Sequence, residues 1–164
     1  MSKIDEASEK DICYWSRFKK RNIDTLTNFD KNKNLDNEFE FKKQANFAVC
    51  CSAMFSNADA IIAISKDGVT PSLLSSFRPA CPIYAITSDA KTCKQMAVEN
   101  NVTAILIENE TDYDQLLEKG IEILKSKGLL KEKDTVVLSG GISKEVNNSK
   151  KFLSNQSTGT IIKI

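Results

Sequence analysis

The sequence predicts an α/β protein, a three-layer α/β/α sandwich around a mostly parallel five-stranded sheet. Short runs of Ile, Val and Ala alternate with segments of helical periodicity through the second half of the chain. Because these runs are apolar at successive positions, both faces of each strand are expected to be buried, as in a parallel sheet covered by helices. One helix separates each run from the next, which favours right-handed crossovers. At 164 residues, 41% of them apolar, the chain has the size and composition of one globular domain.

The first part of the chain is predicted to be an interdomain helix and connector over residues 1–35. Apolar side chains recur at loose helical spacing over residues 3–22, and the composition then becomes polar and rich in Asn, Asp and Lys. A second helix is expected from Asp36, because acidic residues follow it and small and apolar residues then recur every three or four positions. The sandwich is expected to occupy residues 36–164.

Four strands and three further helices are predicted between residues 60 and 139. Thr70 is expected to cap the first of these helices, with Pro71 at its first position, and Thr111 is expected to cap the last. The predicted strands are AIIAI (60–64), PIYAIT (82–87), TAILI (103–107) and TVVLS (135–139). The predicted helices cover residues 71–77, 90–100 and 111–127.

The tail is polar from Gly140 to Gly159. We expect about twenty residues there without regular structure, which is long for a loop and indicates either a binding loop or disorder. The final segment TIIKI, residues 160–164, is expected to form a short antiparallel strand at the edge of the sheet.

Composition argues against several classes of function. Lys and Arg number 23 against 22 Asp and Glu, so no net field favours nucleic acid or an anionic membrane as a partner. The longest nearly apolar stretch, Phe47 to Phe55, is far shorter than the about 18 residues that span a bilayer. A soluble, cytoplasmic protein is expected. With no histidine, and five cysteines that lack CxxC spacing, neither a metal site nor a His-based catalytic set is predicted.

The segment Ser65 to Thr70, SKDGVT, lies between the first predicted strand and the helix that follows it. Backbone N–H groups at a helix N-terminus, hydroxyl groups and a glycine are the components of many phosphate sites. The same residues are typical of a capped strand-to-helix turn, which is the interpretation we favour. Asp67 adds a third possibility, because its carboxylate would repel a phosphate and could itself occupy the anion-binding position at the helix N-terminus.

Several stretches resemble the C-terminal domain of pyruvate kinases. The likeness is weak in residues 13–45 and in the tail. It is carried by SKDGVT (65–70), LLSSFRPACPIYAIT (73–87), CKQMAVENNV (93–102) and GLLKEKDTVVLSGG (128–141), and MSKIDEASEKDI (1–12) resembles the helix that joins this domain to the catalytic barrel.

The resemblance implies a regulatory and oligomerisation domain rather than a catalyst. In the family, a catalytic barrel holds phosphoenolpyruvate, the nucleotide and the Mg and K ions, so this chain alone is expected to be inactive, to need no cofactor and to hold no metal. The implied partners are that barrel, further copies of the chain in a dimer or tetramer, and a phosphorylated small-molecule effector.

The resemblance also implies where such an effector would bind. Two departures weaken the match: Asp67 stands where effector-binding members have a small hydroxyl residue, and Leu116 where they bring a basic one. An alternative is a free-standing, non-catalytic module of the same fold that binds a phosphorylated metabolite. The contacts that the resemblance implies for a phosphorylated effector are Ser65, Lys66, Asp67, Gly68, Thr70, Gly140, Gly141 and Lys144.

Overall fold

The computed structural model confirms the predicted sheet. It describes residues 16–22, 38–140, 143–146, 149–152 and 158–164. The strand order of the main sheet is β3-β2-β1-β4-β7; the first four strands are parallel, and β7 pairs with β4 in the antiparallel direction. The strands are β1 (Ala60–Ile64), β2 (Ile83–Thr87), β3 (Val102–Leu106), β4 (Thr135–Gly140) and β7 (Thr158–Lys163).

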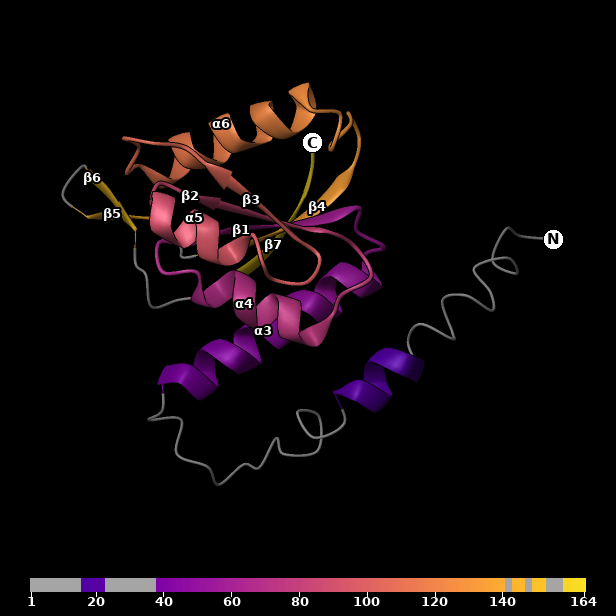
Figure 1. The fold of residues 1–164 in the computed structure, drawn as a ribbon. Coiled ribbons are helices and arrows are strands. Elements are labelled where there is room, and N and C mark those ends of the chain that lie inside the picture. Colours follow the sequence, from indigo (N-terminus) through magenta and orange to yellow (C-terminus); the bar gives the residue numbers. More distant parts are fainter. Residues whose placement is uncertain (1–15, 23–37, 141–142, 147–148, 153–157) are drawn as a thin grey trace.

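Helices cover both faces of this sheet, as the predicted three-layer sandwich requires (Figure 1). The chain moves in one direction from β1 to β2 to β3, so right-handed crossovers place their connecting helices on one face. The return from β3 to β4 places the next helix on the opposite face. The helices are α3 (Glu38–Phe55), α4 (Val69–Phe77) and α5 (Ala90–Met96) on the first face and α6 (Tyr113–Ser126) on the second.

The core consists of two apolar clusters, one on each side of the sheet. Ile61 contributes to the cluster beneath α3 and α4, and Ile62 contributes to the cluster beneath α6. All five residues of β1 are buried, which is why this strand is apolar at successive positions.

A short helix at residues 16–21 also packs on this core. Phe18 is fully buried, and its ring stacks on that of Phe47 with 5.7 Å between the centroids. The side-chain amide of Asn22 donates to the Phe18 carbonyl oxygen at 3.0 Å. The predicted domain boundary at residue 35 is not tested, because residues 1–15 and 23–37 lie outside the described part of the chain.

Two predicted helix starts were wrong by one or two residues. Helix α4 begins at Val69 rather than Pro71, and its N-cap is Gly68 rather than Thr70. Helix α6 begins at Tyr113, and Asp112, not Thr111, caps it by accepting a hydrogen bond from the Gln115 N–H at 3.0 Å. At α6 the aspartate next to the predicted cap supplies the acceptor, and at α4 the Val69 N–H donates at 3.1 Å to Asp67, three residues before Thr70.

The tail also differs from expectation. Strands β5 (Ser143–Val146) and β6 (Ser149–Phe152) form an antiparallel two-stranded sheet inside the segment that was predicted to lack regular structure. Such a ribbon is held by backbone pairing, which a search for apolar runs does not detect. The predicted antiparallel edge strand is confirmed as β7.

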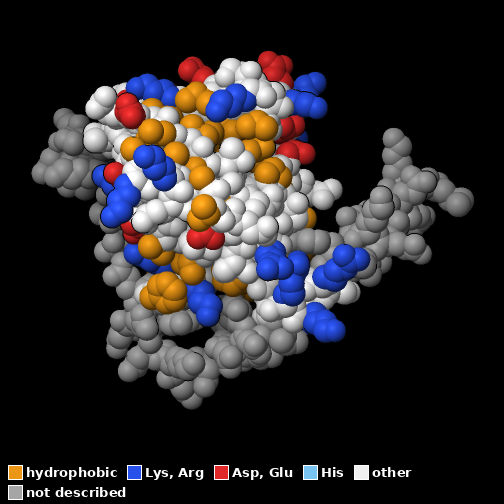
Figure 2. All heavy atoms as spheres, in the orientation of Figure 1, with side chains coloured by type: hydrophobic (Ala, Val, Ile, Leu, Met, Phe, Trp, Pro, Cys, Tyr) orange, Lys and Arg blue, Asp and Glu red, His pale blue; other side chains and the backbone are white. Residues whose placement is uncertain are grey.

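Charged side chains are distributed over the visible surface without one dominant sign (Figure 2). Lys and Arg gather over the helix at residues 16–21, where Lys19, Lys20 and Arg21 are exposed. None of the helices in the described part of the chain combines the length and the apolar character needed to cross a membrane.

Candidate functional site

The loop after β1 lies where ligands commonly bind in open α/β sheets. Strand β1 has β2 on one side and β4 on the other, and the helices that lead to these two neighbours lie on opposite faces of the sheet. Such a switch point leaves a crevice outside the carboxyl ends of the strands. Ser65 and Lys66 begin the loop there, and Gly140 ends the neighbouring strand β4, whose Ser139 pairs with Ala63.

The side chain of Asp67 is bound within this loop. Its Oδ1 accepts a hydrogen bond from the Ser65 hydroxyl at 3.0 Å and another from the Val69 N–H at 3.1 Å. The Gly68 N–H donates to the Ser65 hydroxyl oxygen at 3.0 Å. The loop therefore satisfies its polar groups internally, with a carboxylate in the place where an external anion would meet the helix.

Few backbone donors remain for another anion at this end of α4. The Val69 N–H is bound to Asp67, Pro71 has no N–H, and the Ser72 N–H donates to the Gly68 carbonyl oxygen at 3.2 Å. At most the N–H of Thr70 is left. A negative charge at a helix N-terminus is favourable, and here the chain supplies that charge itself.

Gly68 has a second role that the sequence did not show. Its φ of 75° lies in the left-handed region, and a Cβ at this position would come within 3.3 Å of Thr92 Cγ2 and 3.4 Å of Met96 Cγ on α5. The Thr92 hydroxyl donates to the Lys66 carbonyl oxygen at 3.0 Å. The glycine thus permits the loop to lie directly against α5.

A small cavity separates this loop from the start of α6. It holds about 10 Å³, enough for one water molecule. Leu116, 3% exposed, lines it, and a Cβ on Gly140 would come within 2.7 Å of the nearby Tyr113 hydroxyl. Burial raises the pKa of that hydroxyl. Besides Ser65, the hydroxyl-bearing residues around the cavity are Thr87, Ser88, Thr111 and Tyr113.

The structure thus brings together part of the predicted contact set. Ser65 is buried, Lys66 and Asp67 are exposed, and Thr70 lies in the first turn of α4. Gly140 lies at the same edge of the sheet, whereas Gly141 and the side chain of Lys144 lie outside the described residues. The hydroxyl groups from the ends of β2 and the start of α6 were missed, because only the tertiary fold places them beside the loop.

The described residues contain no cluster of three side chains suited to hold a metal ion. Burial, the largest effect, raises the pKa of the Cys50 thiol strongly, and burial also raises that of Cys81 to about 11. Both thiols are therefore protonated at neutral pH and behave as small core side chains.

The fold and the loop define a class, an α/β sandwich domain with a helix N-terminus at the switch point of its sheet. Residues 45–153, about two thirds of the chain, match the family described as "Pyruvate kinase, alpha/beta domain". The chain belongs to this family, which confirms the resemblance noted from the sequence.

Relatives of the chain are named as pyruvate kinases. Pyruvate kinase of Dictyostelium discoideum is 31% identical over 119 residues, which cover 73% of this chain and 23% of that protein. Pyruvate kinase 1 of Candida glabrata is 31% identical over 131 residues (76% and 26%), and pyruvate kinase of Eimeria tenella is 34% identical over 90 residues (55% and 17%). The chain spans about a quarter or less of the length of these relatives.

Proposed function

We propose that the chain is the regulatory and oligomerisation domain of a pyruvate kinase. In this proposal, transfer of phosphate from phosphoenolpyruvate to ADP takes place on a catalytic barrel that this chain joins as a partner. The observation that supports it is the family match over residues 45–153, in a chain that spans about a quarter or less of relatives named as pyruvate kinases.

The chemistry of the described residues fits a non-catalytic role. Phosphoryl transfer needs cations and metal-bound carboxylates that converge on one point. Several carboxylates here serve the fold instead: Asp89 and Asp112 cap helices, and Glu110 accepts from Lys119 Nζ at 2.6 Å. The pKa of the Glu110 carboxyl is lowered, first by the Lys119 side chain and then by backbone N–H groups.

The regulatory part of the proposal concerns the loop from Ser65 to Thr70. A phosphate group would bind there through the Ser65 and Thr70 hydroxyls, the Gly68 N–H and Lys66, with Gly140 at the same edge of the sheet. Gly141 and Lys144 stay predicted contacts. For this to happen, Asp67 must first leave the N-terminus of α4, because its carboxylate now accepts the hydrogen bonds that the phosphate would need. We therefore propose a loop that is occupied from within and that responds weakly to phosphorylated effectors.

A sugar bisphosphate is a poorer fit than a single phosphate. Two phosphates need positive charge at both ends of the ligand. Lys66 supplies it at the loop, but the start of α6 offers Leu116 and Tyr113 around a cavity of about 10 Å³. A bisphosphate would have to open that cavity and bury a phosphate against a leucine.

A complementation assay tests the main proposal. The purified chain is supplied with phosphoenolpyruvate, ADP, Mg²⁺ and K⁺, and pyruvate is measured with and without a separately expressed pyruvate kinase barrel. We expect no turnover by the chain alone, and a change in the activity of the barrel when the chain is added. Sedimentation should show a dimer or a larger assembly of the chain.

Three outcomes would contradict the proposal: turnover by the chain alone, a barrel whose activity and sedimentation are unchanged by the chain, or a chain that stays monomeric. Tight binding of a phosphorylated metabolite by a chain that ignores the barrel would support the alternative of a free-standing binding module.

A further inference from the structure

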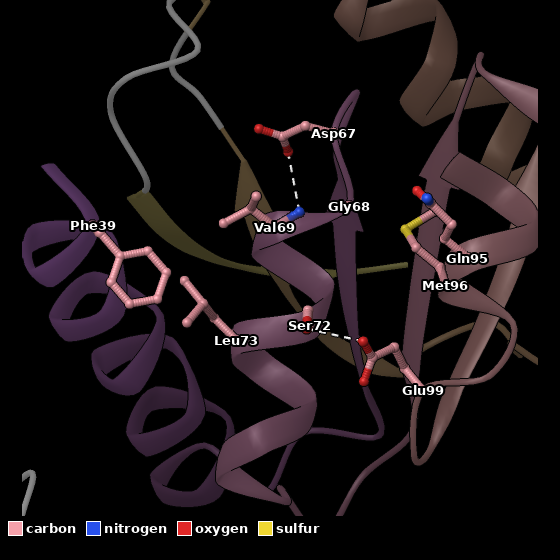
Figure 3. A pocket seen from close by; sticks show the side chains of 9 residues that line it. All are labelled: Phe39, Asp67, Gly68, Val69, Ser72, Leu73, Gln95, Met96 and Glu99. Carbon is pink, nitrogen blue, oxygen red and sulfur yellow. Dashed lines mark hydrogen bonds between the residues drawn. The ribbon is translucent and has the colours of Figure 1, made fainter. Parts of the chain in front are cut away.

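A groove opens beside the first half of α4, between that helix and α5, with the start of α3 at its margin (Figure 3). Its volume is about 330 Å³, within the range of cavities that hold small molecules. It shares no lining residue with the small cavity beside Tyr113. The groove therefore offers the described part of the chain a second site, on the outer side of α4.

Apolar side chains form much of the groove. Val69 and Leu73 line it from α4, and Met96 lines it from α5 (Figure 3). Leu73 is 9% exposed and Met96 is 1% exposed, so packing holds both in place. Phe39 on α3 also lines the groove and is 53% exposed, so the groove suits an apolar body of moderate size.

The charged residues that line the groove are both acidic, Asp67 and Glu99. Asp67 lies at the N-terminus of α4, whose Val69 N–H offsets part of its charge. Glu99 accepts a hydrogen bond from the Ser72 hydroxyl at 2.9 Å, and no Lys or Arg of the described residues pairs with it. An ionised carboxylate accepts several hydrogen bonds, so Glu99 retains capacity for a cationic donor.

These properties select the charge of a ligand. An anion would be repelled by both carboxylates, and a neutral apolar molecule would gain only from contact with Phe39, Val69 and Leu73. An ammonium group on an apolar body would gain from that contact and also from a charge-assisted hydrogen bond. We propose that the groove between α4 and α5 binds a small organic amine, with its ammonium group on Glu99 and its apolar body against Val69 and Leu73.

The test uses phenethylamine, which is protonated at neutral pH, and 2-phenylethanol, which has the same ring and chain without the charge. Each is titrated into the ¹⁵N-labelled full chain at low ionic strength, and amide shifts are followed by NMR. We expect shifts centred on Gly68, Val69 and Glu99, and an affinity for the amine about tenfold higher than for the alcohol.

Variants locate the ammonium group. Glu99→Gln should weaken amine binding about tenfold and leave binding of the alcohol unchanged, because only the charge is removed. The matched control is Glu122→Gln on α6, an exposed position on the opposite face of the sheet, which should bind the amine as the parent does.

Several results would overturn the proposal: equal affinities for amine and alcohol, amine binding that is unchanged in Glu99→Gln, amide shifts centred elsewhere, or no shifts up to the solubility limit. The comparison of amine with alcohol uses the parent chain alone, so it decides the question even if the variant folds poorly. None of these results bears on the proposed role in a pyruvate kinase.

Discussion

Replacement of Asp67 by serine should turn the loop after β1 into a phosphate site. The carboxylate that now accepts hydrogen bonds from Ser65 and Val69 would be gone, and one repulsive charge with it. An incoming anion would then meet four donors: the freed Val69 N–H, the Ser65 hydroxyl, the hydroxyl of the new serine and the Lys66 ammonium group. This is the arrangement that phosphate sites at helix N-termini use.

The expected sizes follow from these contacts. Loss of the bond from Asp67 to the Val69 N–H resembles loss of a helix cap, so the free energy of unfolding should fall by about 1 kcal/mol. For a chain of this size, the melting temperature should then fall by about 2–4 °C. If phosphate binds the variant with a Kd of about 1 mM, about 20 mM phosphate should raise its free energy of unfolding by about 1.8 kcal/mol. Phosphate should therefore more than restore the lost stability.

Differential scanning fluorimetry in phosphate, against sodium chloride of equal ionic strength, measures both effects. The parent should show a much smaller phosphate-dependent shift than the variant. The matched control is Asp89→Ser, which also removes a capping carboxylate, here one that accepts from the Thr92 N–H at 2.6 Å at the start of α5. If phosphate raised the melting temperature of the parent, or of Asp89→Ser, as much as that of Asp67→Ser, the idea that Asp67 occupies a specific anion-binding position would be refuted.

The remaining predictions concern the core. Gly120→Ala should lower the free energy of unfolding by about 1–3 kcal/mol, because its methyl group would overlap Ile86 Cδ1; Ile86→Val should recover part of this loss in urea titrations. Asn46→Ala should lower the free energy of unfolding by about 1–3 kcal/mol, because the buried Ser139 hydroxyl loses the acceptor that it now has at 3.2 Å. Adding Ser139→Ala removes that unpaired hydroxyl, so a double variant no more stable than Asn46→Ala alone would contradict this explanation. Burial raises the pKa of Cys81 from 9.0 to about 11. Alkylation of Cys81 in the folded chain should therefore keep rising up to about pH 11. Because the thiol ionises at lower pH in the unfolded chain than in the folded chain, its contribution to the free energy of unfolding should be present below pH 9.0 and lost towards pH 11. An alkylation rate that stops rising near pH 9 would contradict the burial of Cys81.

The sheet could be predicted because its strands carry a strong local signal. A strand buried on both faces must be apolar at every position, and AIIAI shows this directly in β1. The edge strand was also predictable, since TIIKI is short and terminal. The ribbon of β5 and β6 was not, because the sequences of its strands are polar and the strands pair with each other rather than with a strand of the main sheet.

The loop was only partly predictable. Pattern placed Ser65, Lys66, Asp67 and Gly68 between a strand and a helix, and Asp67 was recognised as a possible occupant of the anion-binding position. The start of α4 was misplaced, because a glycine with positive φ can end a loop as well as a threonine can cap a helix. Tyr113 was missed, since its approach to Gly140 depends on the crossover that carries α6 to the second face.

Asp67 connects the two proposed sites, because it belongs to the loop and also lines the outer groove. A phosphate in the loop would push the Asp67 carboxylate away, and a displaced carboxylate would alter the negative charge that an ammonium group meets in the groove. Asp67→Ser removes that charge and should weaken the amine, but less than Glu99→Gln does, because the Val69 N–H already offsets part of the Asp67 charge. If the two variants weakened the amine equally, Glu99 would have no special part in holding the ammonium group, and the groove would act only through its total charge.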